Sequence, residues 1–408
     1  MQKDRKAGYQ FWLVALLSIN FGIVFFDRNA LNFLMPFVQP DLGLSNTQIG
    51  MLSSALALTW ALAAFGVGRL SDYLGSRKGL LIASTLCFSL CSFLSGIASS
   101  FALLLGVRLL MGVAEGGIMP ISQAMVATTI DPRHRGLAMG VTQNFGSNLL
   151  GSFVAPVALV AFAEAFGWRT SFYLAGIPGL MTAALLWWYI REEPAAPRHM
   201  REEQGPRMSI REAFAERNVL LCSLIAVVLV SYFITTLAFM PIFLTKVRGF
   251  DANTMGWLIG TLGISATVNS FLVSGLSDRI GRKPLMIGAP MLGVILPLGA
   301  MYFDGSPWLL AVIFFFGWSL NGIFPLFMAT IPSESVDPLH SATVMGLVMG
   351  LGEVVGGVVS PTVAGYFGDR FGLSAVLWIL CGLCLIGGVL AIGLRETAPR
   401  RRAMLAIA

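Results

Sequence analysis

The chain has 408 residues, of which 56% are hydrophobic and only 12% are charged, and its mean hydropathy is +0.77. This composition excludes an ordinary soluble domain, which does not need so much apolar surface, and it predicts a protein embedded in a lipid bilayer. The net charge of +6 does not indicate nucleic acid as a partner, because the basic residues gather beside the ends of apolar stretches.

Twelve apolar stretches are long enough to cross a bilayer, which takes roughly 20 helical residues. The N-terminus is basic like the start of a signal peptide, but the first stretch contains Asp27 and Arg28 and lacks a small-residue cleavage site, so we expect it to be retained. The predicted spans are residues 11–36, 46–70, 77–99, 101–127, 136–161, 169–190, 219–246, 254–275, 283–303, 307–331, 341–366 and 373–395.

The distribution of Lys and Arg predicts how these spans are oriented, because basic residues close to span ends are held on the cytoplasmic side. With both termini inside, the cytoplasmic segments carry 21 Lys and Arg and the outer loops carry 4, while Arg28 and Arg108 lie within spans. The sequence therefore predicts a multi-pass protein of a bacterial inner membrane with both termini in the cytoplasm.

The sequence repeats itself at an offset of about 206 residues. Leu70–Gly75 returns as Leu276–Gly281, Asp131-Pro132 as Asp337-Pro338, Gly146 as Gly352 and Gly151 as Gly357. Because six spans return the chain to the cytoplasm, the two copies share one orientation. We therefore predict an all-α membrane protein with two pseudo-symmetric six-helix halves and a substrate site near the midplane between them.

The predicted halves are residues 1–190 and 219–408, and they are joined by the only long hydrophilic stretch, residues 191–218. The mixed charges and prolines of this stretch are typical of a cytoplasmic linker. Its sequence SIREAFAER is expected to form a short amphipathic surface helix.

Four ionisable residues lie at membrane depth, Asp27 and Arg28 in the first span and Arg108 and Glu115 in the fourth. Each raises the cost of insertion by roughly 2.5–3.5 kcal/mol on translocon scales, so we expect them to be used in transport. Arg108 and Glu115 are two helical turns apart, about 10.5 Å along the axis, which is too far for direct contact. Each is therefore expected to interact with another helix, and Asp27 and Arg28 are the candidate partners.

The loop between the second and third spans resembles the motif of the major facilitator superfamily, and a weaker copy lies between the eighth and ninth spans. Asp27-Arg28-Asn29, Arg108 with Gly112 and Glu115, Arg135-Gly136 and Gly167-Trp168-Arg169 further resemble the anion:cation symporter family. That family includes bacterial carriers of sugar acids and other carboxylates. Spinster-like lipid carriers share much of the same pattern.

The first copy of the loop motif comprises Gly68, Asp72, Gly75, Arg77 and Lys78. The resemblance implies that Asp72 faces the N-terminus of span eleven, where a helix dipole favours an anion, and that Arg77 pairs with Asp131 to latch the two halves. In the second copy, Asp278 and Arg282 would act with Glu334 or Asp337. The alternative is a plain basic loop without a gating role.

We assign Arg28 and Arg108 to a substrate carboxylate, because a guanidinium stays protonated and offers a planar fork of donors. We assign Asp27 and Glu115 to protons, as the resemblance also implies, because a desolvated carboxylate can titrate near neutral pH. The alternative is two static salt bridges between helices, since a buried ion pair alone is poor evidence of function.

Further polar side chains at depth are candidates for substrate contacts, although any of them can instead satisfy a neighbouring helix. These candidates are Gln143 and Asn144 in span five, Tyr232 in span seven, Asn321 in span ten and Glu353 in span eleven. Glu353 departs from the pattern of a carboxylate carrier, so a cationic or zwitterionic substrate or a second proton site stays open.

The sequence thus predicts a monomeric, proton-coupled symporter of a small organic anion that works by rocker-switch alternating access. No enzyme activity, cofactor or metal is expected: the five cysteines lie in apolar spans, and all three histidines lie in cytoplasmic segments. One alternative is an exporter or antiporter of amphipathic cations or lysolipid-like molecules. Another is a substrate sensor or membrane enzyme, against which the short C-terminus and the missing nucleophile-base pattern argue.

Overall fold

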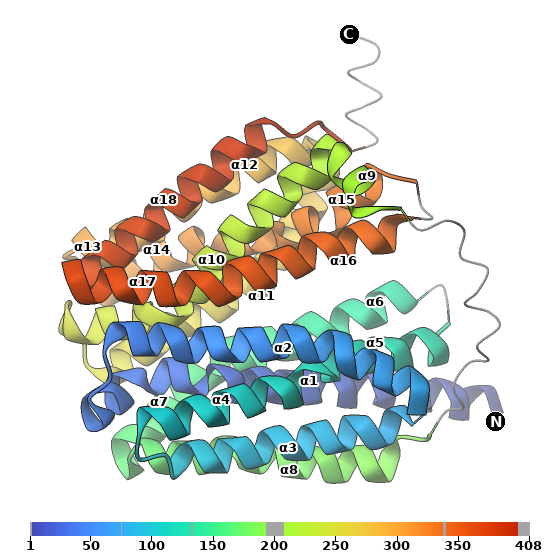
Figure 1. The fold of residues 1–408 in the computed structure, drawn as a ribbon, viewed down its shortest axis with the longest axis horizontal. Coiled ribbons are helices and arrows are strands. Elements are labelled where there is room, and N and C mark those ends of the chain that lie inside the picture. The colour runs from blue at the N-terminus through green and yellow to red at the C-terminus, as the bar shows by residue number, and fades with distance from the viewer. Residues whose placement is uncertain (1, 75, 132–133, 193–207, 338–339, 399–408) are drawn as a thin grey trace. The chain divides into compact units, whose positions relative to one another are not determined.

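The computed structural model describes residues 2–74, 76–131, 134–192, 208–337 and 340–398 (Figure 1). All of the regular structure within these ranges is helical, and twelve helices there are long and apolar enough to cross a membrane. The predicted all-α membrane fold with twelve spans is therefore confirmed. Gly75 lies outside the described residues. For Gly68, Asp72 and Asn144 the structure describes the helical backbone but not the burial or the side-chain contacts.

The chain divides into two compact units. The first unit contains residues 1–196 and 249–264, and the second contains residues 197–248 and 265–408. The helices of the first unit are α1 (Gln2–Leu42), α2 (Asn46–Leu74), α3 (Arg77–Gly96), α4 (Phe101–Gly116), α5 (Ile118–Thr129), α6 (Arg135–Gly140), η1 (Val141–Phe145), η2 (Ser147–Val154), α7 (Ala155–Phe166) and α8 (Trp168–Tyr189).

The second unit follows the same plan. Its helices are α9 (Ile210–Ala215), α10 (Arg217–Lys246), α11 (Ala252–Ile280), α12 (Arg282–Gly293), α13 (Ile295–Tyr302), α14 (Pro307–Gly317), η4 (Trp318–Ile323), η5 (Leu326–Thr330), α15 (Ile331–Glu334), α16 (Ser341–Leu351), η7 (Gly352–Gly357), α17 (Val358–Phe371) and α18 (Leu373–Ile392). The first part of α11, up to Ile264, belongs to the first unit.

The internal duplication recurs in the irregular parts of the helices. The π-helical stretch η2 in the fifth span corresponds, at the offset of 206 residues, to the π-helical stretch η7 in the eleventh. Gly117, which separates α4 from α5 in the fourth span, corresponds to Ile323 at the end of the 3-10 turn η4 in the tenth. Of these irregular turns, the wide π-helical ones occur frequently at functional sites.

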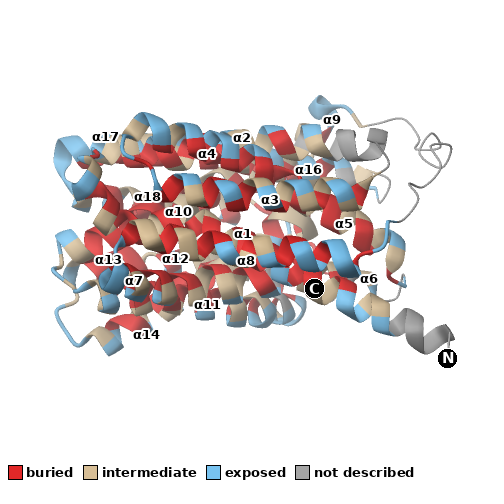
Figure 2. Ribbon diagram, turned by 90° about the horizontal axis from the view of Figure 1, so that it is seen from below, coloured by how far each residue is buried: buried red, intermediate tan, exposed pale blue. Residues whose placement is uncertain are grey.

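The distribution of buried and exposed residues is that of a helix bundle in a membrane, with buried residues inside and apolar side chains on the surface. Figure 2 shows buried residues along α1 and α10, whose most apolar stretches are 56% and 61% buried. Large apolar side chains such as Leu62, Trp188 and Val389 are exposed on other helices. A soluble surface would not carry so many apolar groups, whereas lipid accommodates them at no cost.

The linker helix predicted from SIREAFAER is present as α9. Ser209 caps it, because the Ser209 hydroxyl accepts a hydrogen bond from the Glu212 amide at 3.2 Å while the Glu212 carboxylate accepts one from the Ser209 amide at 2.8 Å. This reciprocal arrangement satisfies two amides that a helix start otherwise leaves unpaired. The bond from the Ser209 amide also lowers the pKa of Glu212.

Candidate functional site

The charged residues predicted at membrane depth lie on two helices of the first unit. Asp27 and Arg28 are on α1, and Arg108 and Glu115 are on α4. Asp27, Arg108 and Glu115 are 0%, 2% and 1% exposed, whereas Arg28 is half-buried. Such burial without lipid contact is expected of groups that face the interior of a bundle.

Asp27 has one hydrogen-bonded oxygen and one oxygen without a partner. The hydroxyl of Ser92, on α3, lies 2.6 Å from Oδ1 of Asp27. The other carboxyl oxygen, Oδ2, makes no hydrogen bond within the described part of the chain. The carboxyl group therefore retains a free acceptor in a fully buried position.

Arg108 is held in place by one of its three guanidinium nitrogens. Its Nη1 donates to the backbone carbonyl of Arg28 at 3.2 Å and lies 3.4 Å from the sulfur of Met111. Among the described residues, Nε and Nη2 find no hydrogen-bond partner. These two nitrogens form one edge of the planar fork that matches a carboxylate.

Glu115 is more isolated than either of these groups. Both of its carboxyl oxygens are buried and make no hydrogen bond to the residues that the structure describes. The Arg28 guanidinium, a possible partner, instead lies over the rings of Phe25 and Trp60, with its central carbon 5.5 and 5.3 Å from the ring centres. Such cation–π contacts stabilise a half-desolvated cation without neutralising its charge.

No ion pair joins these four side chains in the part of the chain that the structure describes. The alternative of two static salt bridges therefore does not account for this geometry. A buried donor or acceptor without a partner costs about 1–3 kcal/mol. Five unpartnered atoms on Asp27, Arg108 and Glu115 make this region a candidate binding site rather than a structural brace.

Two glycines beside Glu115 bring α4 against the backbone of α2. A Cβ added to Gly112 would lie 2.5 Å from the Leu56 carbonyl oxygen, and one added to Gly116 would lie 2.5 Å from the Trp60 carbonyl oxygen. Both obstacles are backbone atoms, so they cannot move aside as a flexible side chain would. The close approach of these helices therefore requires glycine, and it fixes the position of Glu115 relative to Trp60.

Substituting these glycines should destabilise the first unit. Alanine normally favours a helix over glycine by about 1 kcal/mol, but here the collision with α2 should outweigh that gain by about 1–3 kcal/mol. We expect Gly112→Ala and Gly116→Ala to lower the thermal midpoint of the detergent-purified protein. The matched control is Gly106→Ala on the same helix, where nothing lies within 4 Å of the added Cβ. Equal midpoints for all three variants would contradict the packing argument.

The other polar candidate of the first unit whose side chain is described is Gln143. It lies on η1, and its amide nitrogen is 3.8 Å from the sulfur of Met119 on α5. This contact is weak, because a thioether is a poor acceptor, so the half-buried amide keeps most of its bonding capacity.

In the second unit, Tyr232 and Asn321 line a small recess together with Phe233, Trp318, Leu320 and Phe324. Trp318 stacks against Phe233, with ring centres 5.5 Å apart. The Tyr232 hydroxyl donates to the Gly293 carbonyl at 3.2 Å. The polar group of Tyr232 is therefore already engaged by the backbone of the second unit.

Glu353 lies at the start of η7, on the wide turn of the eleventh span, where it is half-buried. The π-helical backbone changes the direction in which this carboxylate points compared with a regular helix. Glu353 already has an interaction partner, so its position alone does not decide between a substrate contact and a structural role.

In the first copy of the loop motif, Arg77 joins two helices of the first unit. The Arg77 guanidinium, at the start of α3, donates to the Ala124 carbonyl and the Thr128 hydroxyl on α5, both at 3.3 Å. Lys78 follows it and is half-buried, and Asp131 lies just beyond the end of α5. Arg77 thus binds the last two turns of α5, the helix that Asp131 follows. Its pairing with Asp131 stays a prediction.

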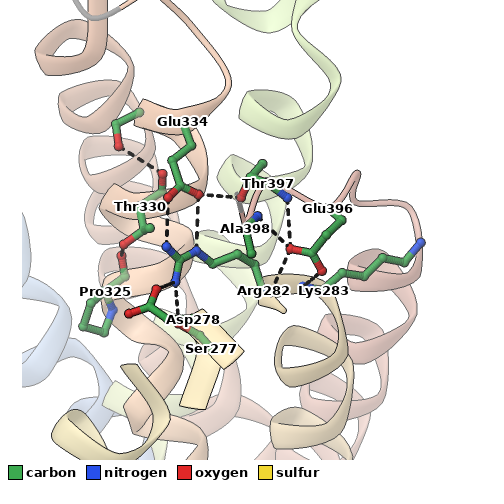
Figure 3. Close-up of polar contacts among 11 residues, drawn as sticks. Ser277, Asp278, Arg282, Lys283, Pro325, Thr330, Glu334, Glu396, Thr397 and Ala398 are labelled. Atoms are coloured by element: carbon green, nitrogen blue, oxygen red, sulfur yellow. Dashed lines mark hydrogen bonds and ion pairs between the residues drawn. The ribbon is translucent and has the colours of Figure 1, made fainter. Parts of the chain in front are cut away.

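The second copy forms a compact ionic cluster around Arg282 (Figure 3). Arg282 contacts Asp278 at 2.7 Å and binds Glu334 through two nitrogens at 2.8 and 3.2 Å. It also donates to the Ser277 hydroxyl at 2.5 Å. Of the two acids left open by the sequence, Glu334 is therefore the partner of Arg282.

The end of the chain after α18 completes this cluster. The Glu396 carboxylate accepts hydrogen bonds from the amides of Arg282 and Lys283, at 2.9 and 3.2 Å, and so caps the start of α12. The Thr397 hydroxyl donates to Glu334 at 2.6 Å (Figure 3). Neither Glu396 nor Thr397 was predicted from the sequence, because a polar residue beyond the last span carries no local signal of a partner that lies 63 or 114 residues away.

Comparison with known proteins supports a transport function. A family model described as "Major Facilitator Superfamily" matches residues 17–354 and 237–405. The chain is 28% identical to a probable 4-methylmuconolactone transporter of Cupriavidus pinatubonensis, over 87% of this chain and 83% of that protein. It is 27% identical to the hexuronate transporter of Bacillus subtilis, over 91% of each chain. It is also 27% identical to a multidrug resistance protein of Enterobacter lignolyticus, over 93% of this chain and 92% of that one.

Among solved structures, the fold is similar to that of a bacterial homologue of the human lysosomal transporter Spinster. The TM-score is 0.74 at 19% identity, with 95% of each chain covered, so this likeness concerns the fold alone. The family model covers nearly the whole chain, and each of the three relatives is matched over 83% or more of its own length. The protein is thus a multi-pass membrane protein of the Major Facilitator Superfamily and a secondary transporter rather than an enzyme.

Proposed function

We propose that this protein carries a small organic anion with a carboxylate group across the bacterial inner membrane, together with one or more protons. The observation that carries the proposal is Arg108, a fully buried guanidinium with two nitrogens that have no partner among the described residues. A substrate carboxylate would accept from both nitrogens and recover the cost of burying them. Arg28, held on the faces of Phe25 and Trp60, would supply a second positive charge.

Charge balance explains why protons would accompany the anion. With Asp27 and Glu115 ionised, the two acids balance the two arginines, and an incoming carboxylate adds one uncompensated negative charge. A net charge is costly in a medium of low dielectric constant. Protonation of either acid restores neutrality, so loading with both anion and proton is favoured over loading with the anion alone.

The named substrates of two relatives agree with this proposal, since one is a hexuronate transporter and another a probable 4-methylmuconolactone transporter. Gln143 and Asn144 in the first unit, and Tyr232, Asn321 and Glu353 in the second, are proposed to contact the rest of the substrate. We further propose that the carrier is a monomer that works by rocker-switch alternating access. The bias of Lys and Arg supports an orientation with both termini in the cytoplasm.

We also propose that the loop motif controls the conformational change from the cytoplasmic ends of the helices. Its residues are Gly68, Asp72, Gly75, Arg77, Lys78 and Asp131 in the first half and Asp278 and Arg282 in the second. The ionic cluster around Arg282 supports this role, because its three charged groups are held by short contacts that a movement of α12 would break.

A second candidate function is export of amphipathic cations or lysolipid-like molecules. Two observations favour it: the half-buried carboxylate of Glu353 and the similarity to a multidrug resistance protein. This function predicts that Glu353→Gln abolishes transport while Arg108→Gln does not. The carboxylate function predicts the opposite order.

The first experiment is thermal stabilisation of the detergent-purified protein by a panel of sugar acids, aromatic acids, short keto acids, amines and lysolipids at pH 5.5 and 7.5. Stabilisation by particular carboxylates, stronger at the lower pH, supports the proposal and identifies the compound for uptake in proteoliposomes. Stabilisation by amines or lysolipids alone would replace it with the second candidate function.

The proton-coupled part of the proposal predicts a specific defect in Glu115→Gln. An inward gradient of one pH unit provides about 1.4 kcal/mol per proton, enough for about tenfold accumulation of a co-transported anion. We expect the wild-type protein to reach this level and Glu115→Gln to show no accumulation. Exchange of labelled for unlabelled substrate should persist in the variant, since Gln keeps the size of the side chain.

Glu192→Gln is the matched control for this measurement, because Glu192 is exposed at the end of the first six spans and should not affect accumulation. Normal accumulation by Glu115→Gln would remove Glu115 from the proton pathway and leave Asp27 as its candidate group.

A further inference from the structure

We propose that Ser92 is a positioning residue that links the protonation of Asp27, on α1, to the backbone of α8. This inference rests on the proposed function, because it concerns the proton that Asp27 would exchange during transport. Ser92 belongs to none of the motifs described above and carries no charge. Its position between two acceptors on different helices assigns it this role.

Three fully buried groups from three helices meet at this point. The Ser92 hydroxyl, on α3, lies 2.6 Å from Oδ1 of Asp27 and 2.9 Å from the backbone carbonyl oxygen of Phe172 on α8. Ser92, Asp27 and Phe172 each have 0% of their surface exposed. Both contacts of the hydroxyl therefore leave its own helix and join neighbouring ones.

The two contacts compete for a single proton. A serine hydroxyl has one hydrogen, a backbone carbonyl has none, and an ionised carboxylate has none. When Asp27 is ionised, the hydrogen of Ser92 can complete the bond to Oδ1 or the bond to Phe172, but not both at full strength. When Asp27 is protonated, it can donate to Ser92, and Ser92 can then donate to Phe172.

The orientation of the Ser92 hydroxyl thus depends on whether Asp27 holds a proton. A separation of 2.6 Å is within the range of a hydroxyl that donates to a carboxylate, so the ionised state draws the hydrogen toward Asp27. Uptake of a proton by Asp27 returns the hydrogen of Ser92 to the Phe172 carbonyl. Each proton taken up on α1 thereby strengthens a hydrogen bond between α3 and α8, and each proton released weakens it.

The packing of α3 against α8 makes this bond a direct link between the helices. A Cβ added to Gly176, one turn after Phe172, would lie 3.0 Å from the Ser89 carbonyl oxygen and 2.9 Å from the ring of Phe93. The two helices are therefore in close contact beside Ser92, so a hydrogen bond between them acts directly on their packing.

The neighbouring serines of α3 show that this geometry is not general. Ser89 and Ser95 are also fully buried, but each donates at 2.9 Å to the carbonyl four residues earlier on its own helix. This is the usual way in which a serine is satisfied inside a membrane helix. Ser95 is therefore a matched control for Ser92: it has the same side chain, helix and burial, but no contact with an acid.

Other groups around Asp27 also carry charge or can titrate, and they stay in place when Ser92 is changed. They are Arg108 and Glu115 from α4 and Cys91 from α3, with Arg28 adjacent on α1. Because all four are common to the wild-type protein and the Ser92 variants, a difference between these proteins reports the hydroxyl itself.

The test follows the carboxyl band of Asp27 by infrared spectroscopy of the full-length protein in liposomes, over a pH titration without substrate. Asp27→Asn identifies the band by its loss. In Ser92→Ala, the ionised carboxylate loses its donor, so we expect the midpoint of the titration to move by about one unit toward alkaline pH. The frequency of the protonated band should also shift, because the carboxyl group no longer donates to a hydroxyl.

Ser95→Ala should leave both the midpoint and the frequency unchanged. Ser92→Cys keeps the size of the side chain with a weaker donor and should shift the midpoint in the same direction by a smaller amount, which gives a second variant if Ser92→Ala folds poorly. A titrating Asp27 band whose midpoint and frequency are the same in the wild type, Ser92→Ala and Ser92→Cys would overturn this inference and leave the proposed function intact. The absence of any titrating Asp27 band would overturn both this inference and the role of Asp27 in the proposed function.

Discussion

Arg108→Gln is expected to lower kcat/KM for carboxylate uptake in proteoliposomes by about 100-fold or more, because two bonds between a guanidinium and a carboxylate contribute about 1.5–3 kcal/mol each. The variant should remain folded, since Arg108 contributes to the described packing through only one of its guanidinium nitrogens. Arg108→Lys should lose most of the activity as well, because a lysine ammonium keeps the charge but lacks the planar fork.

Arg370→Gln is the matched control for Arg108→Gln. Arg370 is exposed at the end of α17 and donates to the Tyr366 hydroxyl at 2.9 Å. Loss of an exposed contact of this kind changes little, so uptake should stay within about twofold of wild type. If Arg108→Gln transported carboxylates as well as this control, the assignment of Arg108 to the substrate would be wrong.

The second large effect concerns stability. We expect Arg282→Gln to lower the free energy of unfolding by about 1–3 kcal/mol, less than for a fully buried ion pair, because Glu334 is 26% and Asp278 is 67% exposed. The Arg282 side chain is only 9% exposed, and its removal leaves Asp278 and Glu334 as two neighbouring carboxylates without a cation between them. Denaturant titration in mixed micelles measures the loss, and it should be largest for the second unit.

Arg279→Gln provides the control, because Arg279 lies three residues before Arg282, in the last turn of α11, and is exposed. The double variant Arg282→Gln with Glu334→Gln should recover part of the lost stability, since it removes one of the uncompensated carboxylates. A loss below about 1 kcal/mol in Arg282→Gln would show that the cluster behaves as an ordinary surface ion pair.

This ionic cluster also fixes the position of Glu396 and Thr397, which follow the last span. Glu396 accepts hydrogen bonds from two amides at the start of α12, where the helix dipole favours an anion. Thr397 binds the same carboxylate, Glu334, that binds Arg282. The cluster thereby joins four segments of the second unit around one cation. They are the end of α11, the start of α12, the end of α15 and the segment that follows α18.

The amino-acid sequence by itself determined the number of spans, their internal duplication and the four charges at membrane depth. These features are local, because a run of about 20 apolar residues forms a helix across a bilayer whatever its neighbours are. The cost of burying charge likewise identifies Asp27, Arg28, Arg108 and Glu115 without any knowledge of their contacts. The similarity of the two loop motifs needed only a comparison of the chain with itself.

Only the tertiary structure decided which side chains meet. Asp27 and Arg108 were expected to find charged partners, yet Asp27 binds Ser92 and Arg108 binds a backbone carbonyl of α1. Glu334 rather than Asp337 binds Arg282, and Glu396 caps a helix that starts 114 residues earlier. Each of these contacts depends on the rotation and axial position of one helix against another, which are set by close contacts such as Gly112 and Gly116 against α2. A change of a few ångströms in that register exchanges one partner for another while the hydropathy of every span stays the same.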